Sequence, residues 1–155
     1  MYMGADKDSG GALRGWMAYP AHERETTSIF ALKQDVRLLN EAVVEYTLEK
    51  PLGRVIAGCG LAADDIDWFL PHLSSEFFRP KLAAALERAG LPLPMERWFT
   101  NLAWTGNTGS ASVYIMLDEL SRSGDIAPGQ KLLLFVPESG RFSSGFIHLT
   151  AVGHA

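Results

Sequence analysis

The chain has 155 residues, of which 47% are hydrophobic and 21% are charged, as expected for one globular domain with a substantial core. Its formal net charge of −4 disfavours nucleic acid or an anionic membrane as a partner. With no long apolar run, no signal-peptide pattern at the N-terminus and a single cysteine, Cys59, we expect a cytoplasmic protein without an internal disulfide.

The first half of the chain predicts a loop, a short strand and then a helical region. The first dozen residues are polar and glycine-rich, which favours a loop, and "GWMAYP", residues 15–20, is typical of a short strand. Apolar residues then recur at alternating steps of three and four, which predicts an amphipathic helix. They are Ile29, Leu32, Val36, Leu39, Val43 and Tyr46. Pro51 breaks or restarts this helix, and "LGRVIAGCG" predicts a last helical piece that ends at Gly58 or Gly60.

The second half alternates strands and helices. Residues 66–70 predict a buried strand that delivers His72 at its carboxyl end, and "PKLAAALERAG" predicts a helix with Gly90 just beyond it. A proline-rich loop leads to a second helix with an apolar stripe, closed by Gly124. "KLLLFVP" and "GFIHLTAV" predict two strands joined by a short loop. We therefore expect a layered α/β domain whose sheet is mixed, because a short connection favours antiparallel pairing.

His72 is the first candidate functional residue. In open α/β sheets ligands bind beyond the carboxyl ends of the strands, where His72 is expected. The plainer interpretation is a loop histidine whose ring is satisfied by a backbone carbonyl. His72 and Glu76 also have a spacing that could present two metal ligands on a helix, but no third ligand stands at a recognisable spacing, so we predict no metal site.

The turn "GNTG" before the second helix is the other candidate. Asn107 can simply cap the turn by bonding to its own main chain, or it can aim its amide into a cavity as a hydrogen-bond donor. The segment lacks the lysine of a P-loop and the G-x-G-x-x-G spacing of a dinucleotide site, so a phosphate-binding α/β module stays a minor alternative. We expect Cys59, on an apolar run, to be a buried structural cysteine.

Two longer stretches carry a family resemblance. Taken together, "DDIDWFLPH" and "NLAWTGNTGSASVYIMLDELSRSGDIAPGQKLLLF" resemble the C-terminal half of a β-ketoacyl-acyl-carrier-protein synthase III, over residues 48–152. The resemblance implies a thiolase-like half, with three α/β/α layers around a mixed five-stranded sheet. It also implies that residues 1–27 are a lead-in from a missing N-terminal half and that residues 28–155 form the C-terminal domain.

The same resemblance implies an activity and a set of site residues. The family uses a Cys-His-Asn triad to condense an acyl thioester with malonyl-acyl carrier protein, and the motif match assigns His72 and Asn107 to the histidine and asparagine. The implied substrate-binding residues are Ser75, Gly106, Gly109 and Gly140, and the implied carrier-protein docking residue is Arg79. The implied partners are acyl-CoA, acyl carrier protein, the N-terminal half and, in the complete enzyme, a second copy in a homodimer. No cofactor is implied, and the resemblance does not distinguish a fatty acid, a polyketide or another compound as the product.

The sequence also departs from the family pattern. The nucleophilic cysteine belongs to the half that this chain lacks, and the usual "HQAN" is "HLSS" here. Phe77 replaces a common basic residue, and Glu138 and Arg141 stand where small residues are usual. We expect Pro80 to strain any helix that begins at Ser74. These departures keep an alternative open, in which the chain is a non-catalytic thiolase-like partner subunit or a carrier-protein-binding module.

Overall fold

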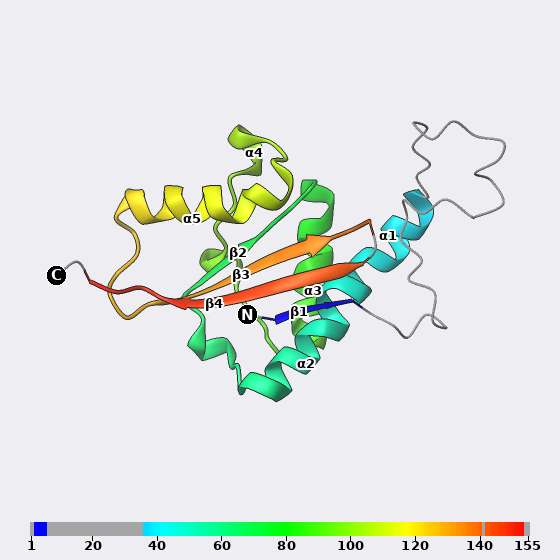
Figure 1. Ribbon diagram of the computed structural model, residues 1–155, viewed down its shortest axis with the longest axis horizontal. Coiled ribbons are helices and arrows are strands. Elements are labelled where there is room, and N and C mark those ends of the chain that lie inside the picture. The colour runs from blue at the N-terminus through cyan, green and yellow to red at the C-terminus, as the bar shows by residue number, and fades with distance from the viewer. Residues whose placement is uncertain (1, 6–35, 141, 154–155) are drawn as a thin grey trace.

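The computed structural model describes residues 2–5, 36–140 and 142–153 and shows one mixed sheet with helices on both faces (Figure 1). The strands are β1 (Tyr2–Ala5), β2 (Trp68–Pro71), β3 (Lys131–Glu138) and β4 (Ser143–Thr150). The α-helices are α1 (Val36–Val44), α2 (Lys50–Cys59), α3 (Arg79–Arg88), α4 (Leu102–Thr105) and α5 (Ser112–Ser123). A π-helix spans Glu45–Glu49, and short 3₁₀ turns span Ala63–Asp65, Glu76–Phe78, Met95–Arg97 and Gly109–Ala111.

The sheet has the strand order β1-β4-β3-β2. β2 runs parallel to β3, whereas β4 pairs antiparallel with both β3 and β1, so the predicted mixed sheet is confirmed. The described residues form four strands instead of the five expected, with one isolated parallel bridge between Phe69 and Trp98 beyond β2. Pro92 and Pro94 precede this bridge, and proline has no N–H with which to extend a ladder.

The side chains of β3 alternate between two cores. Leu132 and Leu134 pack with α5 on one face, while Leu133 and Phe135 pack with α2 and α3 on the other. Figure 1 shows α5 and the short α4 on one side of the sheet and α1, α2 and α3 on the opposite side. A strand covered on both faces buries residues of both parities, which is why "LLLF" is continuously apolar. This arrangement is the expected three-layer α/β/α architecture.

The helical region around Pro51 continues through the proline without a break. Pro51 has no N–H to donate to a carbonyl four residues earlier, and its ring would clash with that carbonyl in an ordinary α-helix. Here the backbone N–H of Lys50 donates instead to the Glu45 carbonyl, five residues back, and the chain makes one π-helical turn. That turn places Thr47 in the buried wall beside the site described below.

Several expectations about local structure need correction. Tyr2–Ala5, expected to be loop, form β1 on the free edge of β4. Pro80 causes no strain, because α3 begins only at Arg79 and a proline in the first turn interrupts no intrahelical bond. The predicted strand at residues 15–20, the start of the first helix and the boundary at residue 27 lie outside the described residues.

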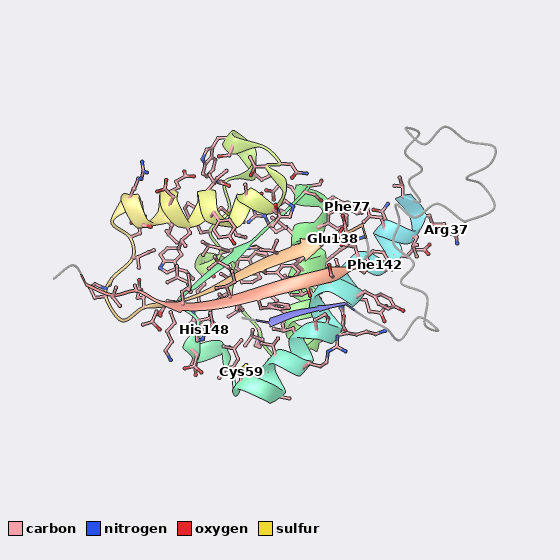
Figure 2. All side chains as sticks on the ribbon, in the orientation of Figure 1. Arg37, Cys59, Phe77, Glu138, Phe142 and His148 are labelled. Carbon is pink, nitrogen blue, oxygen red and sulfur yellow. The ribbon has the colours of Figure 1, made fainter. Side chains whose placement is uncertain are left out.

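Cys59 is exposed, contrary to the expectation of a buried cysteine (Figure 2). It is the last residue of α2, and Gly60 ends that helix in the left-handed conformation with a φ of 64°. The chain then turns back so that Leu61, with 8% of its surface exposed, takes the next core position. The last buried residue of α2 is therefore Val55, and Cys59 lies on the exposed final turn of the helix.

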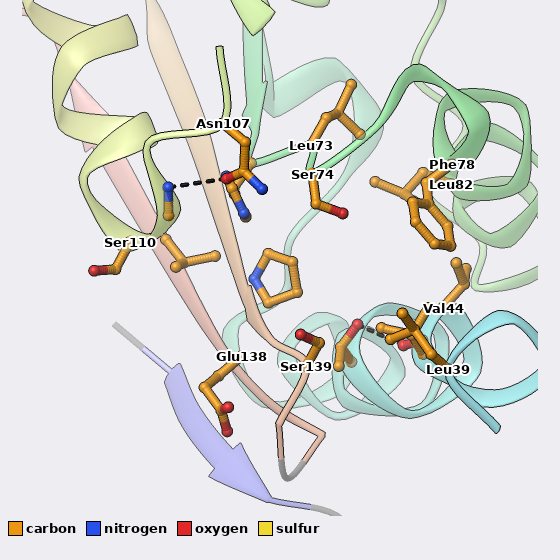
Figure 3. Close-up of a pocket in the computed structure, with 16 residues that line it drawn as sticks. Leu39, Val44, Leu73, Ser74, Phe78, Leu82, Asn107, Ser110, Glu138 and Ser139 are labelled. Carbon is orange, nitrogen blue, oxygen red and sulfur yellow. Dashed lines mark hydrogen bonds between the residues drawn. The ribbon is translucent and has the colours of Figure 1, made fainter. Parts of the chain in front are cut away.

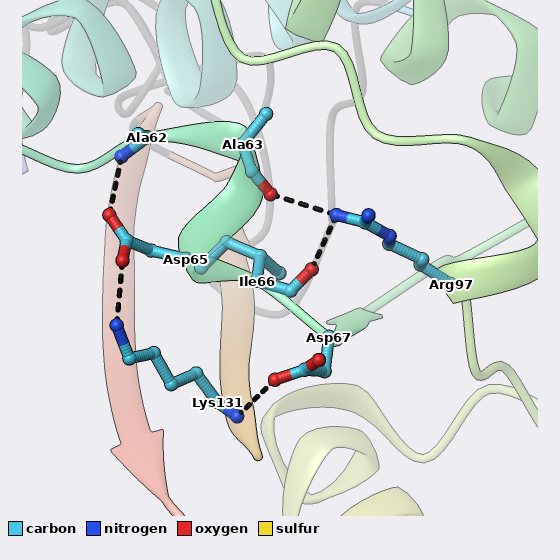
Figure 4. Close-up of polar contacts among 7 residues, drawn as sticks. All are labelled: Ala62, Ala63, Asp65, Ile66, Asp67, Arg97 and Lys131. Carbon is cyan, nitrogen blue, oxygen red and sulfur yellow. Dashed lines mark hydrogen bonds and ion pairs between the residues drawn. The ribbon is translucent and has the colours of Figure 1, made fainter. Parts of the chain in front are cut away.

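Polar contacts secure the end of the sheet opposite to His72 (Figure 4). The Lys131 Nζ lies 2.6 Å from the Asp65 Oδ1, and the Lys131 backbone N–H donates to the Asp67 carboxylate over 2.7 Å. The hydrogen bond from Lys131 lowers the pKa of Asp65. Arg97 donates to the backbone carbonyls of Ala63 and Ile66. These contacts join the starts of β2 and β3 and so stabilise the register that positions His72.

None of the helices in the described part of the chain has both the length and the apolar character needed to span a membrane.

Candidate active site

His72 follows directly after β2, as the sequence predicts. Its backbone N–H donates to the Phe135 carbonyl over 2.8 Å, which extends the parallel pairing of β2 and β3 by one residue. Its half-buried ring places Nδ1 2.7 Å from the Ser112 Oγ at the start of α5. The ring is thus held between the sheet and the first turn of α5, and His72 also lines the pocket described below.

Burial lowers the pKa of His72 below its ordinary value of 6.5, because the charged imidazolium loses hydration. We expect an NMR titration of the His72 ring to have its midpoint below 6.5. Because the unfolded chain then binds a proton that the folded chain does not, the free energy of unfolding should decrease as the pH falls from 6.5 to the folded pKa. This contribution should disappear in His72→Gln. A titration midpoint at or above 6.5 would contradict the conclusion that burial lowers the pKa of His72.

Asn107 lies in a turn built by two glycines with positive φ. Gly106 has φ 78° and ψ −176°, and Gly109 has a φ of 61°. The Asn107 Oδ1 accepts a hydrogen bond of 3.0 Å from the Gly109 backbone N–H, so the turn-capping interpretation is correct. The same bond fixes the orientation of the amide, since only its oxygen can accept. The Nδ2 amino group is therefore the part of the side chain that remains available to a ligand.

A carboxylate secures the chain just before this turn. Glu119 on α5 accepts from the Nδ2 of Asn101 over 2.8 Å and from the Nε1 of Trp104 over 3.0 Å. Asn101 is only 4% exposed, so its amide needs such a partner. Glu119 thereby connects both ends of α4 to α5 and limits how far the Asn107 turn can move.

Replacing Gly106 by alanine should destabilise the protein by about 1–3 kcal/mol, because its φ and ψ lie in a region essentially restricted to glycine. Space is not the cause, since nothing lies within 4 Å of an added Cβ. Gly53→Ala in α2 is the matched control: it also meets nothing within 4 Å, but it should be neutral or stabilising, since alanine is the better helix former. Urea denaturation of both variants measures the difference. Equal effects would contradict the conformational argument.

His72 and Asn107 both line a pocket of about 420 Å³ at the carboxyl ends of β2 and β3 (Figure 3). Its polar lining also includes Ser74, Ser139 and Glu138. The remaining wall is mainly apolar and comes from the helical region and α3: Leu39, Val43, Val44, Phe78 and Leu82. Among the described residues, no group of three or more His, Cys, Asp or Glu side chains could hold a metal ion.

The other predicted site residues are placed differently. Gly109 lines the pocket, but Ser75, Gly106 and Gly140 are not among its lining residues. Ser75 instead caps the 3₁₀ turn Glu76–Phe78 by accepting from the Phe77 backbone N–H. Gly106 shapes the Asn107 turn, and Gly140 is buried after β3.

Arg79 makes contacts within the chain. Its Nε lies 2.6 Å from the Glu76 carboxylate and its Nη2 donates to the Thr100 Oγ1 over 2.6 Å.

Sequence reasoning missed Ser112, Thr47 and Ser74. Their roles depend on contacts between elements far apart in the chain, although the position of Ser112 at the start of a predicted helix was visible.

A mixed sheet between helical layers, with a histidine and an asparagine at the carboxyl ends of its strands, defines a thiolase-like α/β domain. The family described as 3-oxoacyl-[acyl-carrier-protein] synthase III, C-terminal, matches residues 56–147. The chain therefore belongs to this family, and the sequence resemblance is confirmed.

Individual relatives agree with this assignment. The β-ketoacyl-[acyl-carrier-protein] synthase III of Xanthomonas campestris pv. campestris is 38% identical over 87 residues, which are 56% of this chain and 25% of that protein. The solved structure of the corresponding synthase from Thermus thermophilus gives a TM-score of 0.70 at 28% identity and covers 99% of this chain and 46% of that one. The Pseudomonas aeruginosa synthase shares the fold, with a TM-score of 0.68 at 23% identity. The chain thus spans less than half the length of the proteins it matches.

Proposed function

We propose that this chain is the C-terminal catalytic domain of a β-ketoacyl-acyl-carrier-protein synthase III-type acyltransferase. In this proposal His72 and Asn107 hold the thioester oxygen of a malonyl group bound to acyl carrier protein. The observation that carries the proposal is that both side chains line one pocket at the carboxyl ends of β2 and β3. Membership of the family supports it.

The chemistry suits the two residue types. When malonyl thioester loses carbon dioxide, the bond to the carboxylate breaks and its electron pair forms an enolate, whose negative charge develops on the thioester oxygen. Two fixed N–H donors at that oxygen stabilise the charge more in the transition state than in the ground state. Burial favours neutral His72, so it would act as a hydrogen-bond donor and keep its proton. The enolate carbon then attacks the acyl thioester and displaces the thiolate.

The nucleophilic cysteine of this reaction would come from outside the chain. Cys59 is exposed at the end of α2 and does not line the pocket of His72 and Asn107. We therefore assign the nucleophile to an N-terminal half, which the longer relatives leave room for. Acyl-CoA would load that cysteine, malonyl-acyl carrier protein would supply the extender, and the assembled enzyme would be a homodimer without a cofactor.

Carrier-protein docking through Arg79 stays part of the proposal. Glu76 and Thr100 already occupy donors of its guanidinium, and 31% of the Arg79 side chain is exposed. An acidic carrier protein would thus have to share or replace the Glu76 carboxylate. Phe77 follows Glu76 directly in the sequence. Its side chain is 54% exposed and lies beside the Lys81 ammonium.

The test of the proposal is carbon dioxide release from malonyl-acyl carrier protein by the assembled protein, compared with variants at His72 and Asn107. Loss of release in both variants supports the assignment. Full activity in both would show that the chain is a non-catalytic partner, and the alternative function would then be adopted.

A further inference from the structure

Arg79 connects the two segments that carry the candidate donors. It is the first residue of α3 and belongs to the segment that follows His72. Its partner Thr100 belongs to the segment that leads into the Asn107 turn. The Arg79 Nη2 donates to the Thr100 Oγ1 over 2.6 Å, across 21 positions in sequence. A side-chain contact therefore joins these two segments directly.

The Glu76 carboxylate orients the Arg79 guanidinium toward Thr100. Its Oε2 accepts from the Arg79 Nε over 2.6 Å and its Oε1 accepts from the Nη2 over 3.0 Å, so the two planar groups are held by two bonds. The hydrogen bond from Arg79 lowers the pKa of Glu76, so the pair stays charged at neutral pH. Half of the Glu76 side chain is exposed, and such an ion pair adds little stability by itself. Its effect therefore lies in the direction it gives to the guanidinium.

Residues 100–106 are also held by their other neighbours. Phe99, just before them, donates its backbone N–H to β2 over 2.9 Å, and Glu119 on α5 accepts from two side chains of the segment. A cavity of only about 10 Å³ separates the segment from the end of β2, so the two are packed with almost no free space. Arg79 adds the contact from α3. The segment is thus anchored to β2, α5 and α3 before it reaches Asn107.

We propose that Arg79 is a positioning residue, which together with Glu76 sets the distance between His72 and the Asn107 turn. A rigid guanidinium fork can bind a carboxylate and a hydroxyl at once, so it transmits the position of the segment after His72 to Thr100. This inference rests on the proposed function, because the distance affects a rate only if both donors meet one oxygen. A misplacement of about 1 Å can then lower the rate by about a hundredfold.

Carrier-protein docking would use a different part of the same guanidinium. Within the described part of the chain, the hydrogen bonds of Arg79 are made by Nε and Nη2, which leaves Nη1 for a carrier carboxylate. The two roles have different kinetic signatures. Loss of docking raises the KM for malonyl-acyl carrier protein, whereas loss of positioning lowers kcat and leaves KM nearly unchanged.

The first test is the rate of carbon dioxide release by the assembled protein with malonyl-acyl carrier protein. Arg79→Gln should lower kcat by about tenfold to a hundredfold with little change in KM. Thr100→Val has nearly the same shape as threonine and lacks the hydroxyl, so it should lower kcat in the same way. The double variant should lose no more than the larger single effect, because both changes break one contact. Thr100→Ser keeps the hydroxyl and should retain nearly the full kcat.

Arg88→Gln is the matched control on the same helix. Arg88 also holds a carboxylate with Nε and Nη2, at 3.0 Å and 2.7 Å, but that carboxylate belongs to Glu49 on the π-helix. Neither residue lines the pocket of His72 and Asn107. Loss of this ion pair should therefore leave both kcat and KM unchanged.

The position of the Asn107 turn can also be followed without turnover. The chain has three asparagines, Asn40, Asn101 and Asn107, so labelling with ¹⁵N-asparagine gives three side-chain amide groups in a ¹H–¹⁵N spectrum. Single substitutions of Asn40 and Asn107 by alanine assign them. Arg79→Gln and Thr100→Val should both shift the signals of the Asn107 amide, whereas Arg88→Gln should leave them in place.

The outcomes separate positioning from docking and from the proposed function. A raised KM with unchanged kcat in Arg79→Gln would show docking alone and overturn the proposal. Unshifted Asn107 signals in both Arg79→Gln and Thr100→Val, or additive losses in the double variant, would also overturn it. If His72→Ala and Asn107→Ala kept decarboxylation, the proposed function would fail, but the Asn107 signals would still decide whether Arg79 positions the turn.

Discussion

Replacing His72 or Asn107 by alanine should lower the rate of malonyl-thioester decarboxylation in the assembled enzyme by about a hundredfold to a thousandfold, the usual cost of removing one donor from a developing oxyanion. The two side chains line the same pocket, and the Nδ2 of Asn107 is oriented by the bond that its Oδ1 accepts from Gly109. Because both donors would serve one oxygen in the proposed reaction, the double variant should lose less than the product of the two single effects.

Matched controls make this result specific. His148→Ala removes an exposed histidine on β4 that does not line the pocket, and Asn40→Ala removes an exposed amide on α1. Both should keep the full rate, measured as carbon dioxide release and checked against circular dichroism spectra of all four variants. Retention of the rate in folded His72→Ala and Asn107→Ala would contradict the proposed roles.

Phe135→Ala should cost about 3–5 kcal/mol of folding free energy, the largest stability effect that we predict. Phe135 is 1% exposed, stacks on Phe146 with ring centroids 5.1 Å apart and belongs to the core between the sheet and the layer of α2 and α3. Its carbonyl also receives the His72 backbone N–H, so a local collapse here would disturb the site. A domain of this size is stable by about 5–15 kcal/mol, so the variant should be partly unfolded or close to it.

Phe77→Ala provides the comparison, since Phe77 is 54% exposed and packs on Phe78 and under the Lys81 ammonium. Loss of that exposed contact should cost about 1 kcal/mol or less. Urea unfolding with a shared m-value measures both variants. A Phe135 variant as stable as the Phe77 variant would show that this core is not packed as described.

Local patterns predicted the elements that depend on nearby residues. The apolar run before His72 and "KLLLFVP" are strands, the stripe from Val113 to Leu120 is a helix closed by Gly124, and the short loop between the last strands gives antiparallel pairing. The family was also recognisable, because two motifs stood at the family's spacing. The roles of Ser75, Gly140 and Arg79 stay predictions.

Features that depend on distant partners were not predicted. The polar, glycine-rich start of the chain gave no reason to expect β1, which forms only because β4 offers a free edge. Cys59 sits on an apolar run but is exposed, because Gly60 turns the chain so that Leu61 enters the core. Sequence periodicity indicates which face of a helix is apolar. It does not indicate which residues at the end of the helix lie beyond the core, as Cys59 does at the end of α2.

By itself, the sequence determined that this protein is an α/β domain of the synthase III family with a histidine at a strand end and an asparagine in a glycine turn. Those properties follow from local periodicity, backbone demands on glycine and motif spacing. Only the tertiary structure decided that the His72 ring meets the Ser112 hydroxyl, 40 positions away in sequence, and that the two candidate donors line one pocket. The parallel register of β2 and β3 and the packing of α5 on the sheet bring these groups together, and such long-range packing leaves no periodic signal in the chain.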